Sequence, residues 1–419
     1  MNSSLLTTDD VLERARCLVG YPLCDACLGR QFAQISHGLD NKERGAIIRE
    51  ALGGTAIPPV DCWLCDGLLS ELESFVNLVS AALAPYEYAT FLIGSRIEDT
   101  IEVQEAELAA ITGASEQTKR EINREIGKRL EKQTNAEVDF DHPDITAIVD
   151  TQYGDIDLDI RPLFIYGRYK KLVRGIPQTK WWCRKCHGTG CDYCEGTGKM
   201  YEESVEDYIA TPAVNATGAA DESFHGAGRE DIDVRMLGTG RPFILELIKP
   251  HHRVIDLTEL QMAINAYGIG KVEVMHLCFT ERSKIEYIKS ARWTKMYRAV
   301  VKMSNRGKLN EAVTALRNCS ISQRTPSRVV HRRADKIRQR CILDIHIDEV
   351  TNDLVTLVIH AESGTYIKEL ITGDGGRTAP SLQQLMDCPI KMQTLDVIQI
   401  GDEYGEKIER IEKQDKTDT

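Results

Sequence analysis

The stretch Ala227–Phe243 reads AGREDIDVRMLGTGRPF. Three arginines and three carboxylates in this stretch precede Pro242. The segment Pro242 to Ile248 is an apolar run bounded by prolines and predicts a strand. Arginine–carboxylate pairs in loops are mostly solvated and contribute only about 0 to 1 kcal/mol. By itself the stretch therefore indicates a loop before a strand and leaves its chemistry open.

Other strands are predicted on the C-terminal side of this stretch. Period-two alternation or β-branched residues mark the strands, the Thr351-Asn352-Asp353 turn predicts a hairpin, and Gly268 ends a helix. Small and polar residues from Ala210 to Gly226 predict a loop or domain entry. The expected fold class is α+β, with a mixed, mainly antiparallel sheet and a few helices on its faces. The predicted strands are Val272–Phe279, Met296–Met303, Ile342–Ile347 and Leu354–His360, and the helix is Leu257–Tyr267.

The N-terminal half shows a different pattern. Apolar residues at three- and four-residue steps predict helices over Ser70–Tyr86 and Glu116–Lys132. Extended segments follow around Val138 and from Ile145 to Val149, so this middle region is also predicted to be α+β. The tail KIERIEKQDKTDT is expected to be frayed.

Length and composition limit the class of protein. A chain of 419 residues exceeds one typical domain, so two or three cores are expected. No apolar run is long enough to cross a bilayer, and the N-terminus lacks the basic residues of a signal peptide. The protein is therefore expected to be cytoplasmic, with no membrane partner.

The charge distribution indicates a polyanionic partner despite a net charge of -12. Arg161–Lys185 holds eight Lys/Arg and no acid, with Tyr166, Tyr169, Trp181 and Trp182 interleaved. Arg292–Lys308 holds six and no acid, and Arg324–Arg340 holds seven with one acid, Asp335. One such run could be a solvated face, but three in an acidic chain favour a phosphate-binding surface.

Eight of the 13 cysteines form four C-x-x-C pairs, which indicate metal rather than disulfides in a reducing compartment. Four thiolates can enclose Zn²⁺ as a closed, structural tetrahedron. The first expected set could instead be two unrelated buried pairs; the second, in CRKCHGTGCDYCEGTG, is a tighter zinc-ribbon pattern that would fix a loop touching RNA. The two sets are Cys24, Cys27, Cys62 and Cys65, and Cys183, Cys186, Cys191 and Cys194.

The second cysteine set also suggests a DnaJ-type chaperone, because its CxxCxGxG repeats accompany an upstream His142-Pro143-Asp144. That interpretation is rejected. A J-domain places His-Pro-Asp after a basic helix, whereas EVDFDHPDITAIV is acidic and extended. The tripeptide is instead predicted to be a turn between strands.

Three ordered motifs resemble the pseudouridine synthases. Gly228-Arg229-Glu230-Asp231 is similar to their Gly-Arg-x-Asp signature, Lys295 to Ala299 to their Lys-x-Tyr-x-Ala strand, and Gly364 to Lys368 to their Gly-Thr-Tyr-Ile-Arg/Lys segment. The amino-acid sequence over most of Lys180–Gln399 most resembles that of the archaeal and eukaryotic Pus ten family. The resemblance implies a pseudouridine-synthase core, an N-terminal region with a THUMP-like RNA-binding module, and conversion of uridines 54 and 55 of the tRNA T-loop.

The resemblance also implies roles for single residues. Asp231 would act on the ribose as nucleophile or as base, and Lys368 would keep it ionised through an ion pair. Tyr297, Tyr366 and Ile367 would contact the flipped-out nucleotide, and Arg229 would support the loop or a phosphate. No catalytic cofactor is required, and no obligate protein partner is inferred.

Simpler interpretations of these residues stay open. Tyr297 could be a core aromatic residue, Lys368 could lie in solvent at a helix start, and Glu230 or Asp233 could be confused with Asp231. The implied domains are a zinc-bearing head (1–70), a THUMP-like accessory domain (71–175) and the synthase domain (176–419).

Two other functions compete with this one. A tRNA methyltransferase or sulfur-inserting enzyme would need a glycine-rich nucleotide loop, and Gly268-Ile269-Gly270-Lys271 is too short for one. A noncatalytic zinc protein that binds RNA is the second alternative.

Overall fold

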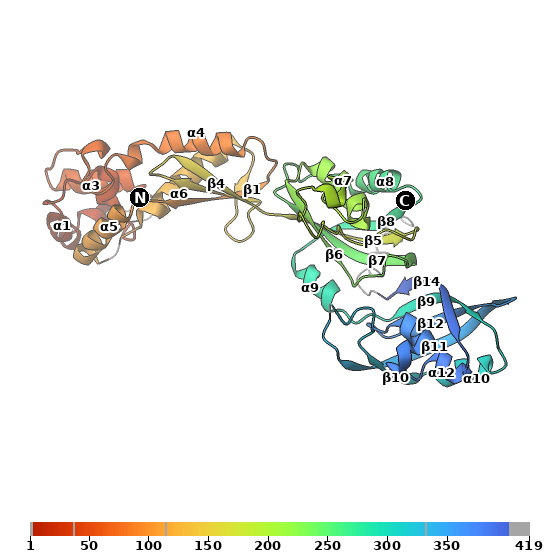
Figure 1. Ribbon diagram of the computed structural model, residues 1–419. Coiled ribbons are helices and arrows are strands. Elements are labelled where there is room, and N and C mark those ends of the chain that lie inside the picture. The colour runs from red at the N-terminus through yellow and green to blue at the C-terminus, as the bar shows by residue number, and fades with distance from the viewer. Residues whose placement is uncertain (1–2, 37, 114, 332, 402–419) are drawn as a thin grey trace, which may run out of the picture. The chain divides into compact units, whose positions relative to one another are not determined.

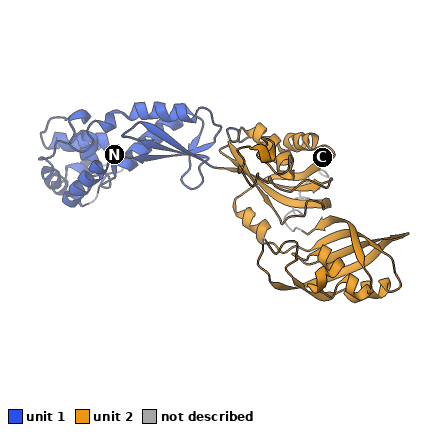
Figure 2. Cartoon of the chain, viewed as in Figure 1, with its two compact units in different colours: residues 1–161, 251–253 blue, residues 162–250, 254–419 orange. Residues whose placement is uncertain are grey.

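The computed structural model describes residues 3–36, 38–113, 115–331 and 333–401. The chain divides into two compact units (Figures 1 and 2). Unit 1 comprises residues 1–161 and 251–253, and unit 2 comprises residues 162–250 and 254–419. The C-terminal tail expected to be frayed lies outside the described residues. Among the described residues, no helix is long and apolar enough to cross a membrane.

Unit 1 combines helices with a four-stranded sheet of order β2-β1-β3-β4. Strand β1 pairs in parallel with β2 and β3, whereas β3 and β4 are antiparallel. The helices are α1 (Asp9–Arg16), α2 (Asp25–Arg30), α3 (Asn41–Ala51), α4 (Leu72–Leu83), α5 (Asp99–Thr112) and α6 (Thr118–Gln133), and the strands are β1 (Thr90–Arg96), β2 (Glu137–Val138), β3 (Ile145–Asp150) and β4 (Asp155–Ile160).

The predicted helices of unit 1 form because each buries one apolar stripe. In α6, Ile122, Ile126 and Leu130 are at most 1% exposed, and α4 buries Phe75, Val76 and Val79 in the same way. Both helices pack on the four-stranded sheet and on each other. The helices predicted over Ser70–Tyr86 and Glu116–Lys132 are therefore confirmed, and His142–Asp144 lies between β2 and β3 as expected.

Unit 2 is built on a ten-stranded sheet. Its main path is β13-β10-β11-β12-β9-β14-β7-β5-β8, and β6 pairs with β7. Its strands are β5 (Leu163–Lys171), β6 (Asp221–Gly226), β7 (Arg235–Ile248), β8 (Val272–Thr280), β9 (Lys295–Met303), β10 (Cys319–Arg324), β11 (Ile337–Thr351), β12 (Leu354–Ala361), β13 (Thr378–Ala379) and β14 (Ile390–Ile400), and its helices are α7 (Val205–Thr217), α8 (Leu257–Tyr267), α9 (Ser283–Ser290), α10 (Leu309–Leu316), α11 (Ile367–Thr372) and α12 (Leu382–Met386). Short 3-10 turns complete the chain: η1 (Ser3–Thr7), η2 (Pro59–Asp61), η3 (Leu68–Ser70), η4 (Asp192–Cys194) and η5 (Gly373–Gly376).

The sheet of unit 2 is mixed and mainly antiparallel, which confirms the expected fold class. Of its pairings, β7 with β14 is parallel, and the others are antiparallel. The β11–β12 hairpin turns at Asn352, whose φ is 38°, as the Thr351-Asn352-Asp353 pattern predicted. Helices α7 and α8 pack against each other, α8 packs on β8, and α10 packs on β11 (Figure 1).

The loop predicted over Ala210–Gly226 is wrong. The segment holds the second half of α7 and all of β6. Ser204 caps α7 through its hydroxyl, which accepts a hydrogen bond from the Asp207 N–H, and the helix continues through Pro212 because Tyr208, Ile209 and Ala213 are buried in the core. Tertiary packing thus overrides the weak helix propensity of a stretch that holds Pro212 and several β-branched residues.

The expected start of the synthase domain at residue 176 stays a prediction. Strand β5 lies in the sheet of unit 2, where it pairs with β7 and β8, and the two units divide at residue 161. The expected division of the N-terminal region at residue 70 stays a prediction. One apolar cluster of unit 1 runs from Leu6 to Ile160 across that position.

Candidate active site

The Gly-Arg-Glu-Asp motif forms the loop between β6 and β7. Gly228 has φ +80°, and a Cβ there would lie 3.2 Å from Arg241 Nη1 and 3.4 Å from Lys295 Nζ. Arg241 Nη1 donates to the Ala227 carbonyl at 2.8 Å, and Gln178 Nε2 donates to the Gly228 carbonyl at 2.9 Å. Glycine is therefore required for both the backbone conformation and the close approach.

Glu230 anchors the loop to the core of unit 2. Its side chain has no exposed surface, accepts from Arg241 Nε at 2.8 Å, and accepts from the Tyr169 hydroxyl at 2.9 and 3.0 Å. Burial and the Glu230 charge raise the pKa of Tyr169, so this phenol stays protonated and donates. Glu230 is therefore a buried anchor of the loop, whereas the Asp231 side chain is 41% exposed.

Lys171 fixes the backbone on the far side of the motif. Its fully buried Nζ donates to the carbonyl oxygens of Asp231 at 3.1 Å and of Ile232 at 3.3 Å. Burial lowers the pKa of this lysine. With both neighbouring backbone groups held, the Asp231 side chain projects from a rigid turn.

Asp231 is the carboxylate of the motif that reaches solvent and two cations at once. Its side chain is 41% exposed, and its Oδ2 lies 3.2 Å from Lys368 Nζ and 2.8 Å from Arg328 Nη1. Lys368 begins α11 and is 23% exposed, so it does not extend into solvent. The structure thus brings together Asp231 and Lys368 from segments far apart in the sequence.

Asp233 shares the lysine but not the arginine. Both of its oxygens accept from Lys368 Nζ at 2.8 Å, and its side chain is 69% exposed. Partial burial works against ionisation, but the Lys368 hydrogen bond and charge outweigh it and lower the pKa of Asp233. A pocket of about 420 Å³ adjoins this pair; Asp233 and Lys368 line it together with Arg174, Thr372 and residues 390–395.

Arg328 is a site residue that the motifs did not identify. Besides Asp231, it bonds Glu369, whose Oε1 accepts from Arg328 Nε at 2.7 Å and whose side chain is 6% exposed. Arg328 lies in the basic window Arg324–Arg340. That window was the sequence signal for it, but a count of charges could not single out one arginine.

The two predicted tyrosines occupy different positions. Tyr366 precedes α11, its backbone N–H donates to Gln323 Oε1 at 2.9 Å, and its hydroxyl accepts from Arg333 Nη1 at 3.2 Å. Tyr297 lies on β9, is 8% exposed and belongs to the main core, where burial raises its pKa to about 12. Ile367 is 3% exposed in the same core.

Lys295 lies beneath the motif loop on the same strand as Tyr297. Its Nζ is the second atom that a Cβ at Gly228 would meet, and burial, followed by repulsion from Arg241, lowers its pKa to about 8. Arg229 points elsewhere: it is exposed, and its guanidinium lies 5.8 Å from the centroid of the Trp181 ring.

The first basic window is only partly a surface. Tyr166, Tyr169 and Lys171 have no exposed surface, and Arg168 is 3% exposed, because β5 is an interior strand between β7 and β8. Tyr166 and Tyr169 therefore belong to the core and not to a surface. Trp182, at the C-terminal end of that window, is 54% exposed, and Trp181 is partly buried.

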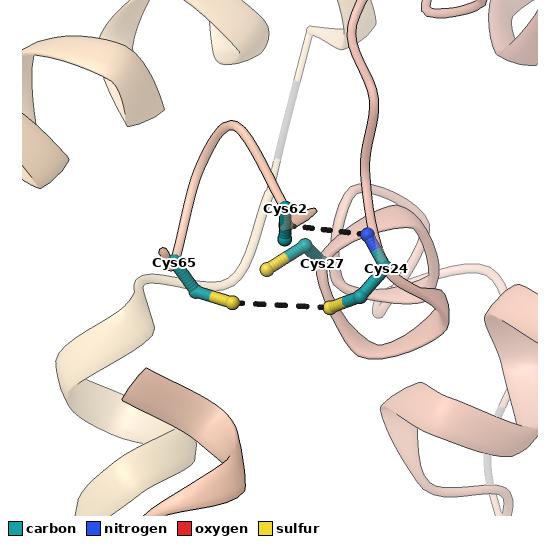
Figure 3. Close-up of side chains that lie close together, drawn as sticks. All are labelled: Cys24, Cys27, Cys62 and Cys65. Atoms are coloured by element: carbon teal, nitrogen blue, oxygen red, sulfur yellow. Dashed lines mark hydrogen bonds between the residues drawn. The ribbon is translucent and has the colours of Figure 1, made fainter. Parts of the chain in front are cut away.

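The first cysteine set closes around one point in unit 1 (Figure 3). The four Sγ atoms lie within 4.8 Å of one another, and those of Cys24 and Cys65 are 3.9 Å apart. A tetrahedron with metal–sulfur bonds of about 2.3 Å has sulfur–sulfur edges of about 3.8 Å. Cys24 N–H donates to Cys62 Sγ at 3.2 Å, and the fully buried Arg30 donates to Cys27 Sγ at 3.3 Å. The set therefore fits a closed, fully buried metal centre.

The second set has the same geometry nearer the surface of unit 2. Its Sγ atoms also lie within 4.8 Å, with Cys183–Cys191 at 3.8 Å and Cys186–Cys194 at 3.7 Å. Two backbone N–H groups, of Cys191 and Gly198, donate to Cys194 Sγ at 3.3 and 3.2 Å. Among the described residues, these two sets are the groups that could hold a metal ion.

Comparison with known proteins identifies the family. The model described as "Pus10, C-terminal" matches residues 164–401, more than half of the chain, and "Pus10 THUMP domain, archaeal" matches residues 75–150. A solved Cbf5-Nop10-Gar1 complex has a chain 15% identical with a TM-score of 0.30, covering 47% of this chain and 45% of that one, a similarity too low to carry an argument.

Curated relatives match over nearly their full length. The tRNA pseudouridine synthase Pus10 of Methanothrix thermoacetophila is 39% identical over 97% of this chain and 98% of its own. That of Halorubrum lacusprofundi is 41% identical over 96% of this chain and 99% of its own. These matches confirm the resemblance carried by the three motifs. The chain therefore belongs to the Pus10 family of tRNA pseudouridine synthases and is an isomerase.

Proposed function

We propose that the protein converts uridine to pseudouridine in tRNA, at uridines 54 and 55 of the T-loop, with Asp231 as the catalytic group. The observation that carries the proposal is the environment of Asp231, a half-exposed carboxylate on an anchored loop between Lys368 and Arg328. The positions 54 and 55 come from the family resemblance.

The reaction needs an ionised carboxylate beside the ribose. The bond from ribose C1′ to uracil N1 breaks, the detached ring turns, and C1′ bonds to C5, whose proton is lost while N1 gains one, so substrate and product are isomers. Asp231 begins this by attacking the sugar or by removing its 2′ proton. Lys368 and Arg328 pair with the carboxylate and fix its orientation.

The remaining site residues are assigned to the nucleotide. Tyr366 stands at the start of α11 with its hydroxyl held by Arg333, a geometry suited to packing against a flipped-out uridine. Tyr297 and Ile367 are largely buried, so each is assigned only a small contact with the nucleotide. Tyr297, with a pKa of about 12, stays protonated at neutral pH. Arg229 is assigned to a phosphate outside the uridine pocket.

The substrate is proposed to be bound by both units in the cytoplasm, without a membrane or an obligate protein partner. Support for an RNA-binding role of unit 1 comes from the THUMP family match over residues 75–150. Both cysteine sets are proposed to hold structural zinc, because a closed shell of four thiolates leaves no position for a reacting water.

Site mapping tests the proposed reaction and its positions together. Purified protein is incubated with unmodified tRNA transcript, and pseudouridine is mapped by carbodiimide-dependent primer stops. New stops at 54 and 55 are expected. Stops elsewhere would refute the assigned positions, and no stops with an intact tRNA and a folded protein would refute the reaction.

Arg328→Gln is expected to lower the single-turnover rate by roughly tenfold. This loss is smaller than the roughly 100-fold loss that follows removal of a buried hydrogen-bond donor, because the Arg328–Asp231 pair is partly exposed. The rate of pseudouridine formation at saturating tRNA is the measurement. Arg324→Gln is the matched control: this arginine lies on the same segment but bonds Asp335. Equal effects of the two substitutions would show that Arg328 acts only through general charge.

Cys183→Ser is expected to remove one of two bound metal ions per chain while the thermal unfolding of the protein changes little. The second cysteine set lies outside the main apolar core of unit 2, so the sheet does not depend on it. Metal content by mass spectrometry and calorimetry measure the two effects. Loss of both metal ions, or collapse of the main transition, would contradict this expectation.

A further inference from the structure

A second pocket lies beside the zinc-type ribbon of unit 2. It has a volume of about 520 Å³ and is lined by Trp181, Trp182, Arg184, Met200, Arg229 and His331. This volume falls within the range of about 300 to 1,000 Å³ typical of ligand sites. Two indoles and two guanidiniums line it, and no carboxylate occurs among these described lining residues.

The second cysteine set holds the two tryptophans in place. Cys183 follows Trp182 directly, its N–H donates to the Gly198 carbonyl at 2.7 Å, and Trp182 forms a β-bridge with Lys199. Gly188, between the two C-x-x-C pairs, has φ +105°, and a Cβ there would lie 3.2 Å from the Trp182 ring. One part of the Trp182 ring therefore packs against the segment around Gly188 that carries the second cysteine set, while 54% of the residue is exposed.

The other wall of the pocket comes from segments that also reach Asp231. Arg229 precedes Asp231 by two positions in the motif loop, so the two Cα atoms can be no more than about 7 Å apart. His331 lies on the segment that carries Arg328, the arginine bonded to Asp231. Two segments that contribute residues to this pocket therefore also carry Asp231 and its partner Arg328.

This composition suits one nucleotide of a single-stranded RNA segment. Exposed indoles stack on any base, and guanidiniums contact the phosphate that follows it. Arg229 already lies over the Trp181 ring, 5.8 Å from its centroid, so a cation stands beside the exposed Trp182. A nucleotide bound here would keep the RNA strand unstacked next to a flipped-out uridine.

We propose that this pocket binds a nucleotide that flanks the modified uridine, with its base stacked on Trp182 and its phosphate contacted by Arg184 and Arg229. The proposal rests on the proposed function, because the flanking nucleotide belongs to the RNA substrate. It gives the second cysteine set a role: the metal-fixed ribbon presents the stacking surface.

Trp182→Ala tests the proposal in the full-length protein. The expected result is a rise of roughly 5- to 100-fold in the tRNA concentration needed for half-maximal rate, from the loss of one stacked base. The single-turnover rate at saturating tRNA is expected to change less than threefold, since Asp231 and its cations are untouched. Trp182→Phe, which keeps a stacking face, is expected to restore most of the affinity.

Tyr193→Ala is the matched control. Tyr193 lies on the same ribbon with 52% exposure but does not line the pocket, so its removal should leave tRNA affinity unchanged. Equal effects of Trp182→Ala and Tyr193→Ala, or no effect of Trp182→Ala on affinity, would overturn the proposal. Wild-type protein that forms no pseudouridine would instead overturn the proposed function.

Arg184→Gln keeps the proposal testable if Trp182→Ala loses metal. Arg184 is exposed and its replacement removes one phosphate contact without disturbing the ribbon. The slope of log affinity against log salt is expected to fall by about 0.7, the value for one contact to a single strand. An unchanged slope would exclude the phosphate contact assigned to this arginine.

Discussion

Asp231→Asn is expected to reduce pseudouridine formation by about 10,000-fold or more, the scale reached when an enzyme loses a principal catalytic side chain. The amide keeps the size of the carboxylate and its place on the loop but supplies neither a nucleophilic oxygen nor a base. Single-turnover assays on a tRNA transcript measure the loss. Affinity for tRNA is expected to stay within a few-fold of the wild type, since the backbone anchors at Lys171 and Gln178 remain.

Asp233→Asn provides the matched control for Asp231. It lies two positions along the same loop, shares Lys368, and is 69% exposed against 41% for Asp231. Its replacement is expected to lower the rate less than tenfold, through a shift of Lys368. A larger loss at Asp233 than at Asp231 would mean that the catalytic carboxylate has been misassigned.

Cys24→Ser is expected to unfold unit 1. Binding of a structural zinc by four thiolates contributes about 10 to 16 kcal/mol, which equals or exceeds the roughly 5 to 15 kcal/mol that stabilises a whole domain. The four cysteines of this set are at most 2% exposed and belong to the apolar cluster that spans unit 1. Metal content and amide hydrogen exchange are the measurements. The expected results are loss of one metal ion per chain and rapid exchange across unit 1.

Cys17→Ser separates this effect from general loss of a thiol. Cys17 is an exposed cysteine seven positions before Cys24 and lies outside both four-cysteine sets. Its replacement should leave metal content and exchange protection at wild-type values. A Cys24→Ser protein that retained slow exchange in unit 1 and both metal ions would refute the structural role of this centre.

Much of the fold followed from local pattern. Helix α8 begins and ends at the predicted residues Leu257 and Tyr267, and the ends of α4 and α6 lie within three residues of the predicted ones. These elements have a clear apolar stripe and a clear stop. Helix α7 was missed because Pro212 and small residues are also typical of loops. The Ser204 cap and the burial of Tyr208 and Ala213 in the core stabilise the helix.

The site was predicted in part. The motif order led to Asp231 and Lys368, and the structure places their charged atoms 3.2 Å apart. Arg328 and the structural role of Glu230 did not follow from any motif. Arg328 reaches Asp231 across almost a hundred positions, and Glu230 differs from Asp231 only in whether its side chain turns into the core or away from it.

The sequence by itself determined the family, the cysteine pairs and the residues that can carry the chemistry, because these depend on residue type and spacing along the chain. Only the tertiary structure decided which neighbouring carboxylate is buried, which cations meet Asp231, and which aromatic residues of the first basic window remain exposed. Those outcomes depend on contacts between distant segments and on exclusion of water, and no local pattern specifies either.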